Sequence, residues 1–161
     1  QGLRFYLVYG YLNHNFKWMM KKSLEKIPFV GAACRISKHI MVDRSSASAI
    51  QQTMDSAKRI LKDGMSLVVF PEGSRTPDGE MKKFKRGAFS LATEFGLPIV
   101  PLTIDGSYDV MPKNTFRITP GKISLTIHKP IYFDKVGADN KALTEELLEK
   151  SYNVIKSGLP G

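Results

Sequence analysis

Cysteine is nearly absent from this sequence, in which Cys34 is the only one among 161 residues. A single thiol excludes an intrachain disulfide framework and is typical of a reducing compartment. Because Cys34 follows an apolar run, we expect a buried structural thiol rather than a nucleophile. The three histidines and the one cysteine show no metal-ligand spacing, so we expect no metal site.

Long hydrophobic runs are also absent. No apolar stretch approaches the roughly 20 residues that are needed to span a bilayer. The first residues lack the charged region and cleavage site of a signal peptide. The chain starts at Gln1 rather than at methionine, and we expect it to be truncated at the N-terminus. Its 161 residues, without repeats or linkers, predict a single domain over residues 1–161.

Acidic residues are scarce beside basic ones, with 15 Asp and Glu against 24 Lys and Arg, which gives a net charge of +9. Such an excess favours an anionic partner, which is a nucleic acid, an anionic membrane surface or a phosphorylated small molecule. The basic residues are not interleaved with stacking aromatic residues, and no helix-turn-helix or zinc pattern is present. We therefore expect no nucleic acid partner.

What is present is an alternation of short apolar runs with amphipathic segments. We expect strands at 36–42, 66–70, 98–104 and 122–128, and helices at 47–62, 87–95 and 144–156. Ser45 or Ser46 and Thr144 are the expected N-caps, and Gly64 and Gly96 the expected C-terminal stops. This order predicts an α/β fold, a single domain with a largely parallel mixed sheet that is flanked by helices.

The segment before the first expected strand has two interpretations. Residues 3–12 are apolar and aromatic, and their length does not decide between a strand and the end of a helix. Residues 13–31 place aromatic and aliphatic side chains among lysines, which suits a membrane interface where lysine stems snorkel. The alternative is a core-facing segment with a solvated lysine face.

The stretch 66–76 passes from an apolar, β-branched run into proline, glycine and charge. We expect a buried strand that ends at Pro71, because proline cannot donate to a sheet ladder. Glu72 and Arg75 would then lie at the carboxyl edge of the sheet, where open α/β folds bind their ligands. A strand followed by a solvated turn is the alternative.

Positive groups follow the expected strands in the same way. Arg44 follows the first strand as Arg75 follows the second, and the basic stretch 82–86, which includes Lys85, leads into a helix. The N-terminal amides of a helix also favour an anion. These three elements predict a phosphate pocket, in which Glu72 orients the arginines or accepts a hydrogen bond from a substrate hydroxyl.

The segment 70–76, Phe-Pro-Glu-Gly-Ser-Arg-Thr, resembles the F-P-E-G-T-R-S signature of the lysophosphatidic acid acyltransferases, a family of glycerolipid acyltransferases. Further segments are similar to the family's other motifs in the same order, at residues 16–31, 42–45, 84–89 and 99–102. The resemblance extends over residues 16–130, and four ordered motifs make it specific.

The resemblance implies an O-acyltransferase that moves a fatty acyl group to the free hydroxyl of 1-acyl-glycerol-3-phosphate, which gives phosphatidic acid. Acyl-carrier protein or acyl-CoA would be the co-substrate, and no separate cofactor is expected. The protein would associate with an anionic membrane surface at its cytoplasmic face. By the same resemblance, Arg44, Glu72, Gly73 and Arg75 bind the glycerophosphate and Pro101 shapes the acyl-side pocket, while Lys85 belongs to the expected phosphate pocket.

The family's general base is a histidine in an H-x-x-x-x-D motif, whose aspartate holds one tautomer of the ring. The residues five beyond His14, His39 and His128 are Met19, Arg44 and Phe133, so the motif is absent from this sequence and the catalytic residues stay unknown. We expect the motif upstream of the segment 16–24. The alternatives are another lysophospholipid or glycerol-3-phosphate as acceptor, and a non-catalytic domain that binds a lipid phosphate.

Overall fold

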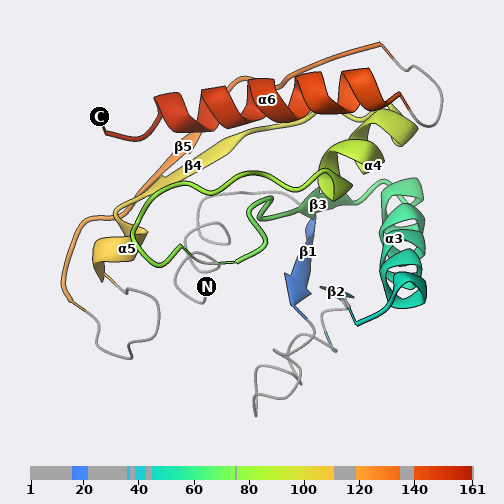
Figure 1. The fold of residues 1–161 in the computed structure, drawn as a ribbon, viewed down its shortest axis with the longest axis horizontal. Helices are drawn as coiled ribbons and strands as arrows, with labels where there is room; N and C mark the ends of the chain where they lie inside the picture. Colours follow the sequence, from blue (N-terminus) through green and yellow to red (C-terminus); the bar gives the residue numbers. More distant parts are fainter. Residues whose placement is uncertain are drawn as a thin grey trace. The chain divides into compact units, whose positions relative to one another are not determined.

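The computed structural model describes residues 16–21, 36, 39–42, 45–74, 76–110, 119–134 and 140–160. The chain divides into two compact units, residues 14–70 and a unit that contains residues 71–161. Strands and helices alternate along both units (Figure 1). The fold is therefore α/β, as the sequence predicts.

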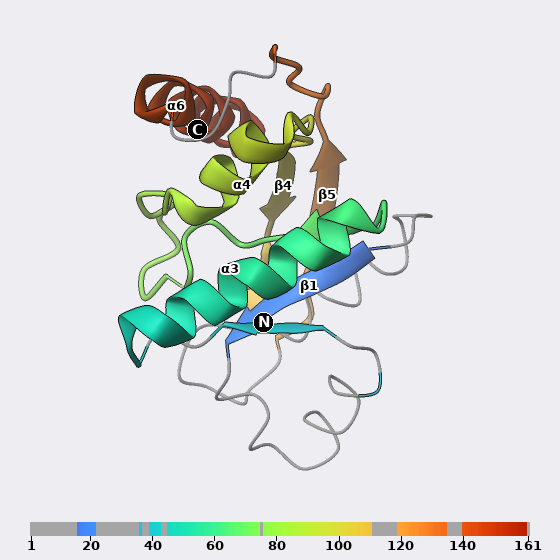
Figure 2. The ribbon, with the colours of Figure 1, turned by 90° about the vertical axis from the view of Figure 1, so that its right-hand side faces the viewer.

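The unit of residues 14–70 is built on a three-stranded sheet in the order β2-β1-β3. Strand β1 (Phe16–Lys21) runs parallel to β2 (Ile40–Val42) and to β3 (Ser66–Val68). Helix α3 (Ala47–Lys62) joins β2 to β3 and packs against both, and Figure 2 shows it lying along the sheet. Strands β2 and β3 thus flank β1 and both run parallel to it, so the parallel part of the prediction is confirmed in this unit.

Strand β1 contributes the aromatic core of this unit. Phe16 and Trp18, two residues apart on one face of the strand, are 7% and 0% exposed. The Trp18 ring stacks on Phe70 at 5.6 Å between centroids and meets Phe16 edge-on at 5.6 Å. The membrane-interface interpretation is therefore wrong for these two aromatic side chains, because both are in the interior. Residues 3–12, 22–31 and Cys34 lie outside the described residues.

The strands of this sheet are shorter than predicted. Ile36 is 82% exposed and β2 starts only at Ile40, while β3 ends at Val68 rather than at Phe70. The register explains the early end of β3. The first three residues of β1 pair with β3, and its last three pair with β2. The chain beyond Val68 leaves the ladder, and the Phe70 ring packs on the Trp18 ring instead.

Helix α3 spans the predicted residues, and both of its ends follow the sequence. The Ser46 hydroxyl accepts the N–H of Ala49 at 3.1 Å, which satisfies one free amide of the first turn. Gly64 ends the helix at a φ of 75°, a left-handed conformation that glycine adopts without strain. Burial is centred on Thr53 and Ala57, while Ile50 is half exposed.

The unit that contains residues 71–161 is built on an antiparallel hairpin. Strand β4 (Leu102–Asp105) pairs with β5 (Ser124–Ile127), and an isolated antiparallel bridge joins Ile99 to Ile131. An antiparallel pair agrees with the mixed sheet that the sequence predicts, although both strands are shorter than predicted. Between them lies the short helix α5 (Ser107–Val110).

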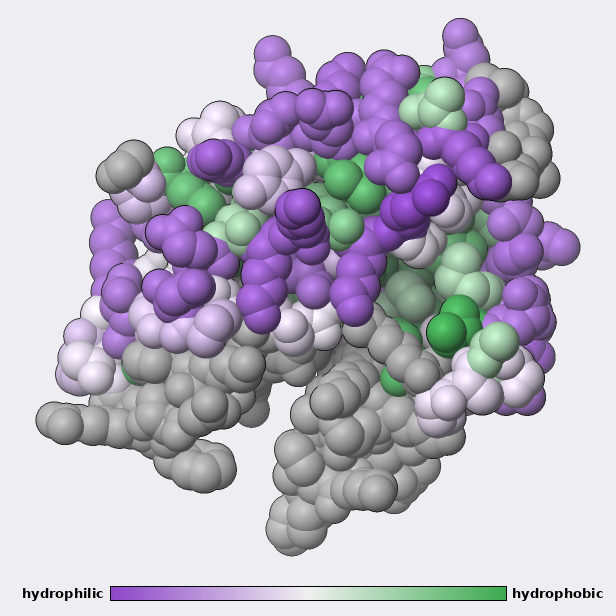
Figure 3. All heavy atoms as spheres, in the orientation of Figure 1, coloured by the Kyte–Doolittle hydropathy of each residue, from purple (hydrophilic) through white to green (hydrophobic). Residues whose placement is uncertain are grey.

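Two longer helices cover this hairpin unit. Helix α4 (Gly87–Phe95) packs on α6 (Lys141–Ser157), and the buried core between them and the hairpin consists of Phe89, Ile131 and Leu147. The outward surface of α6 is mostly hydrophilic in Figure 3. Gly96 ends α4 in a left-handed conformation with a φ of 64°, as predicted.

The start of α6 differs from the prediction. Asn140 is the N-cap, and its side-chain oxygen accepts the N–H of Leu143 at 2.9 Å. Thr144 lies inside the helix and is buried, with its hydroxyl 3.3 Å from that of Thr93 in α4. Asparagine is a stronger N-cap than threonine, so the helix begins three residues before the predicted start at Thr144. Thr144 instead takes part in the contact between α4 and α6.

Candidate functional site

Three of the predicted site residues, Glu72, Gly73 and Lys85, lie in one closed loop, residues 71–86, which we call the motif loop. The carbonyl of Pro71 accepts the backbone N–H of Lys85 at 2.9 Å, so the two ends of the loop meet. Inside this closure, Glu72 Oε2 accepts the N–H of Lys82 at 3.0 Å. Residues that are ten or more positions apart are thereby brought to the base of one loop.

The turn at the base of the motif loop requires glycine. Gly73 has a φ of 73°, in the left-handed region that side chains disfavour. The next residue, Ser74, accepts a hydrogen bond from the Lys82 ammonium group at 3.2 Å. Glu72, Ser74 and Lys82 thus form a polar cluster around the turn, and the carboxylate has a structural role as well as any role toward a ligand.

The basic end of the motif loop leads into α4. The Lys85 side chain is exposed at this end. Arg86 precedes the first turn of α4, which has no side-chain cap, and its guanidinium pairs with Glu145 at 2.9 Å. Both partners of this pair are about half exposed, so the pair stabilises the fold little.

The tip of the motif loop is an ordered turn. The Thr76 hydroxyl donates to the Asp78 carboxylate, which also accepts the N–H of Glu80 at 3.1 Å. The hydrogen bond from Thr76, and then that from Glu80, lower the pKa of Asp78 below its usual value. Thr76 itself is buried, although its neighbours 77–80 are exposed.

Of the other three predicted site residues, the structure describes only Pro101. Pro101 is buried where β4 begins, and its carbonyl accepts the N–H of His128 at 3.0 Å, so it belongs to the hairpin rather than to the motif loop. Arg44 and Arg75 lie outside the described residues. The predicted convergence of both arginines with Lys85 therefore stays a prediction, whereas Glu72, Gly73 and Lys85 do share one loop.

Two histidines lie in the described residues, and both have structural partners. His128 Nε2 lies 2.7 Å from the Thr103 hydroxyl, whose proton goes to the carbonyl of Ile155 at 2.8 Å, so the ring donates to Thr103. His39 Nδ1 accepts the N–H of Trp18 at 3.4 Å. Burial, and then the charge of Lys17, lower the pKa of His39.

The described part of the chain contains no group of three or more His, Cys, Asp or Glu side chains that could hold a metal ion. None of its helices has the length and apolar character that crossing a membrane requires.

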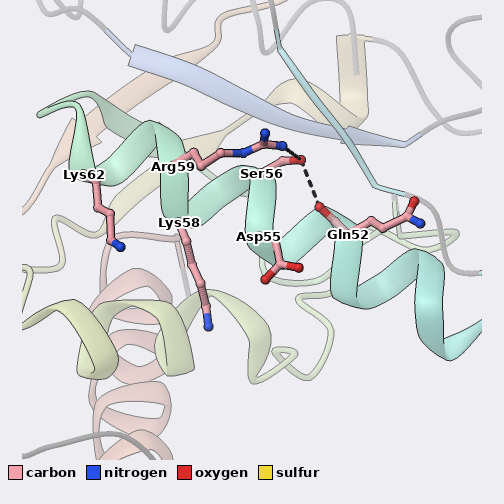
Figure 4. A pocket seen from close by; sticks show the side chains of 6 residues that line it. All are labelled: Gln52, Asp55, Ser56, Lys58, Arg59 and Lys62. Carbon is pink, nitrogen blue, oxygen red and sulfur yellow. Dashed lines mark hydrogen bonds between the residues drawn. The ribbon is translucent and has the colours of Figure 1, made fainter.

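A separate polar surface lies on α3. Six side chains line it in Figure 4, namely Gln52, Asp55, Ser56, Lys58, Arg59 and Lys62. Arg59 donates to the Ser56 hydroxyl at 3.3 Å, and Ser56 donates to the carbonyl of Gln52 at 2.9 Å. None of the predicted site residues lines this surface. Hydrogen bonds between residues of the same helix are typical of a solvated helix face.

Sequence reasoning missed Ser74 and Lys82 as partners, and it missed the role of Thr76 and Asp78. The contact between Ser74 and Lys82 bridges eight residues of irregular backbone, which no periodicity encodes. The turn at Thr76 and Asp78 did have a signal, because Thr-Pro-Asp-Gly is a typical turn sequence.

Known proteins are similar to this chain in fold and in sequence. A solved structure of the 1-acyl-sn-glycerophosphate acyltransferase PlsC from Thermotoga maritima is 32% identical, with a TM-score of 0.70 over 89% of this chain and 55% of that one. The 1-acyl-sn-glycerol-3-phosphate acyltransferase of Limnanthes douglasii is 33% identical over 87% of this chain and 49% of its own length. The protein of the same name from Pseudomonas aeruginosa is 36% identical over 74% of this chain and 46% of its own.

The chain thus spans about half the length of the relatives that it matches. The sequence model of the Acyltransferase family matches residues 4–105, which include the motif loop and β4. That match covers more than half of the 161 residues. The chain therefore belongs to the Acyltransferase family.

Proposed function

We propose that this protein transfers a fatty acyl group to the free hydroxyl of 1-acyl-sn-glycerol 3-phosphate and so forms phosphatidic acid. The names of the three relatives above support this reaction. The single structural observation that carries the proposal is the closure of the motif loop, which places Glu72, Gly73 and Lys85 in one closed loop.

The chemistry of the motif loop suits a phosphate monoester. Ser74 and Lys82 offer a hydroxyl and an ammonium group, and the exposed Lys85 precedes a helix without a side-chain cap. Cations and backbone amides are the groups that hold a phosphate through charge-assisted hydrogen bonds. The acceptor contacts of Arg44 and Arg75 and the acyl-pocket role of Pro101 stay predictions from the sequence.

The reaction joins the acceptor oxygen to the acyl carbon of a thioester. A general base takes the proton from the acceptor hydroxyl, the oxygen attacks the carbonyl carbon, and the thiolate of coenzyme A or acyl-carrier protein leaves and takes up a proton. The histidine and aspartate that the family resemblance implies for the base are not among these 161 residues. The proposed part of this chain is to hold the acceptor phosphate at the cytoplasmic face of an anionic membrane.

An assay of the native protein with a radiolabelled acyl donor tests this function. Lysophosphatidic acid, other lysophospholipids and glycerol 3-phosphate are offered as acceptors, each with acyl-CoA and with acyl-carrier protein. We expect label in phosphatidic acid. Faster labelling of another acceptor would reassign the substrate, and binding of lysophosphatidic acid without transfer would identify a lipid-phosphate binding domain.

The proposed phosphate contact of Arg75 has its own test in the same assay. Loss of a charge-assisted bond costs about 1.5–3 kcal/mol, so Arg75→Ala should lower kcat/KM for lysophosphatidic acid roughly ten- to a hundredfold. Arg59→Ala, on the polar face of α3, is the matched control and should leave kcat/KM unchanged. An Arg75→Ala enzyme with wild-type kcat/KM and acceptor KM would assign Arg75 a structural role.

A further inference from the structure

The tip of the motif loop is held by a residue that none of the family motifs includes. The Tyr108 hydroxyl, on α5, donates to the carbonyl of Pro77 at 2.8 Å. Its ring lies against Gly79, where an added β-carbon would be 3.3 Å from the ring atom Cδ1. Gly79 has a φ of 92°, so both its backbone and its lack of a side chain suit this contact. Tyr108 thus contacts the tip at two points.

The helix that carries Tyr108 is itself fixed to the hairpin. Gly106 precedes it with a φ of 75°, and a β-carbon there would be 2.2 Å from the Lys122 carbonyl oxygen. Only glycine permits this approach of the two backbones. On α5 itself, Ser107 and Val110 are buried. The hairpin therefore determines where the Tyr108 ring lies.

The tip that Tyr108 contacts is close in sequence to the polar cluster of Glu72, Ser74 and Lys82. Pro77 is next to Thr76, whose buried hydroxyl donates to Asp78 and orders the turn. Thr76 is in turn two positions from Ser74, which accepts the Lys82 ammonium group. The Tyr108 contact at Pro77 is thus three positions along the chain from Ser74, a residue proposed to face the acceptor phosphate.

We propose that Tyr108 is a positioning residue for the acceptor. Its hydroxyl holds the tip of the motif loop, so that Ser74 and its partner Lys82 are held in one arrangement before the acceptor phosphate binds. Preorganisation of this kind lowers the ordering cost of binding. The inference rests on the proposed function. Tyr108 lies beyond residues 4–105, the part of the chain that the family model matches.

Tyr108→Phe tests the inference, because it removes one hydroxyl and keeps the ring. We expect the KM for lysophosphatidic acid to rise about three- to tenfold, the effect of one lost hydrogen bond. The KM for the acyl donor, kcat and the melting temperature should stay near wild type. Tyr132→Phe is the matched control, since the Tyr132 side chain is 75% exposed, and it should change none of these values.

A change in both KM values together with a lower melting temperature would show that Tyr108 only stabilises the fold. An unchanged KM for lysophosphatidic acid in Tyr108→Phe would also overturn the inference. Either result leaves the proposed function intact, because the wild-type enzyme is active in the same assay. A wild-type protein without transfer to lysophosphatidic acid would instead overturn the proposed function.

Amide hydrogen exchange supplies a readout that is independent of catalysis. Glycerol 3-phosphate should protect the amides of residues 72–85 in the wild-type protein, and Tyr108→Phe should need about three- to tenfold more of it for equal protection. In the free protein, Tyr108→Phe should exchange faster at residues 76–80. Equal protection and equal exchange in the two proteins would overturn the inference.

Discussion

Glu72 illustrates how one side chain can have two roles. The sequence predicts that it acts on arginines or on a substrate hydroxyl, and the structure shows its carboxylate accepting the N–H of Lys82. A hydrogen bond to a charged group is stronger than a neutral one, so its loss should destabilise the motif loop. The two roles differ in what they require, because loop closure needs an oxygen acceptor and the ligand role needs the charge.

We therefore expect Glu72→Gln and Glu72→Ala to separate these roles. Glu72→Ala should lower the free energy of unfolding by about 1–2 kcal/mol in urea denaturation, because the Lys82 N–H loses its acceptor. Glu72→Gln keeps an amide oxygen and should lose less than about 0.5 kcal/mol, while acyl transfer falls in both variants. Glu80→Ala, an exposed residue of the same loop, is the control. Full activity in Glu72→Gln would leave only the structural role.

Asp78 provides a prediction for pH. Its pKa is lowered in the folded protein, so the tip gains stability from the ionised carboxylate above the usual aspartate pKa of about 4. That contribution is lost as the pH falls through the lowered pKa. We expect an NMR titration of the Asp78 carboxyl group to have its midpoint below the usual value. Thr76→Val should move the midpoint upward, because the largest cause of the shift is the Thr76 hydroxyl.

The exposed Thr126 offers a control for this titration. It lies in β5, and Thr126→Val should leave the Asp78 midpoint unchanged. A midpoint that is equal in wild type and Thr76→Val would contradict the hydrogen bond at the tip of the motif loop.

At the scale of elements, helix ends are where the sequence was most and least informative. The span of α3 and the glycines after α3 and α4 could be predicted, because capping and left-handed residues act locally. The start of α6 could not be predicted. Threonine is a common N-cap, but Thr144 is buried inside the helix, where its hydroxyl contacts that of Thr93. Local patterns therefore locate a helix, and packing decides which of two capping residues begins it.

The Asn140 cap gives the test at this scale. We expect Asn140→Ala to lower the free energy of unfolding by about 1 kcal/mol, because the Leu143 N–H loses its acceptor. Lys141→Ala, in the exposed first turn, should stay within about 0.5 kcal/mol of wild type. Urea denaturation measures both. A neutral Asn140→Ala would contradict the assignment of Asn140 as the cap.

At the scale of the whole molecule, the fold class followed from the alternation of patterns, but strand pairing did not. An alternation of apolar and polar residues predicts β5 as a strand, but it does not predict the direction of the neighbouring strand. In the structure β4 pairs with β5 in the antiparallel direction. The sequence also did not decide whether Phe16 and Trp18 lie at a membrane interface or in the core. An aromatic residue beside lysines suits both an interface and the centre of a sheet, and only pairing on both edges of β1 decides for the core.

The net charge of +9 is a property of the entire sequence and gives the last prediction. Because Phe16 and Trp18 are in the core, they do not supply apolar anchors, and we expect any binding to anionic membranes to depend on charge. Each basic group near such a surface contributes about 1 kcal/mol, and salt screens this attraction. In flotation assays the protein should therefore bind vesicles with about 30% phosphatidylserine at about 50 mM salt and be released at about 500 mM.

Vesicles of phosphatidylcholine alone are the control and should not bind the protein. Binding that resists high salt would mean that apolar contacts dominate, and no binding at low salt would remove the anionic membrane as a partner.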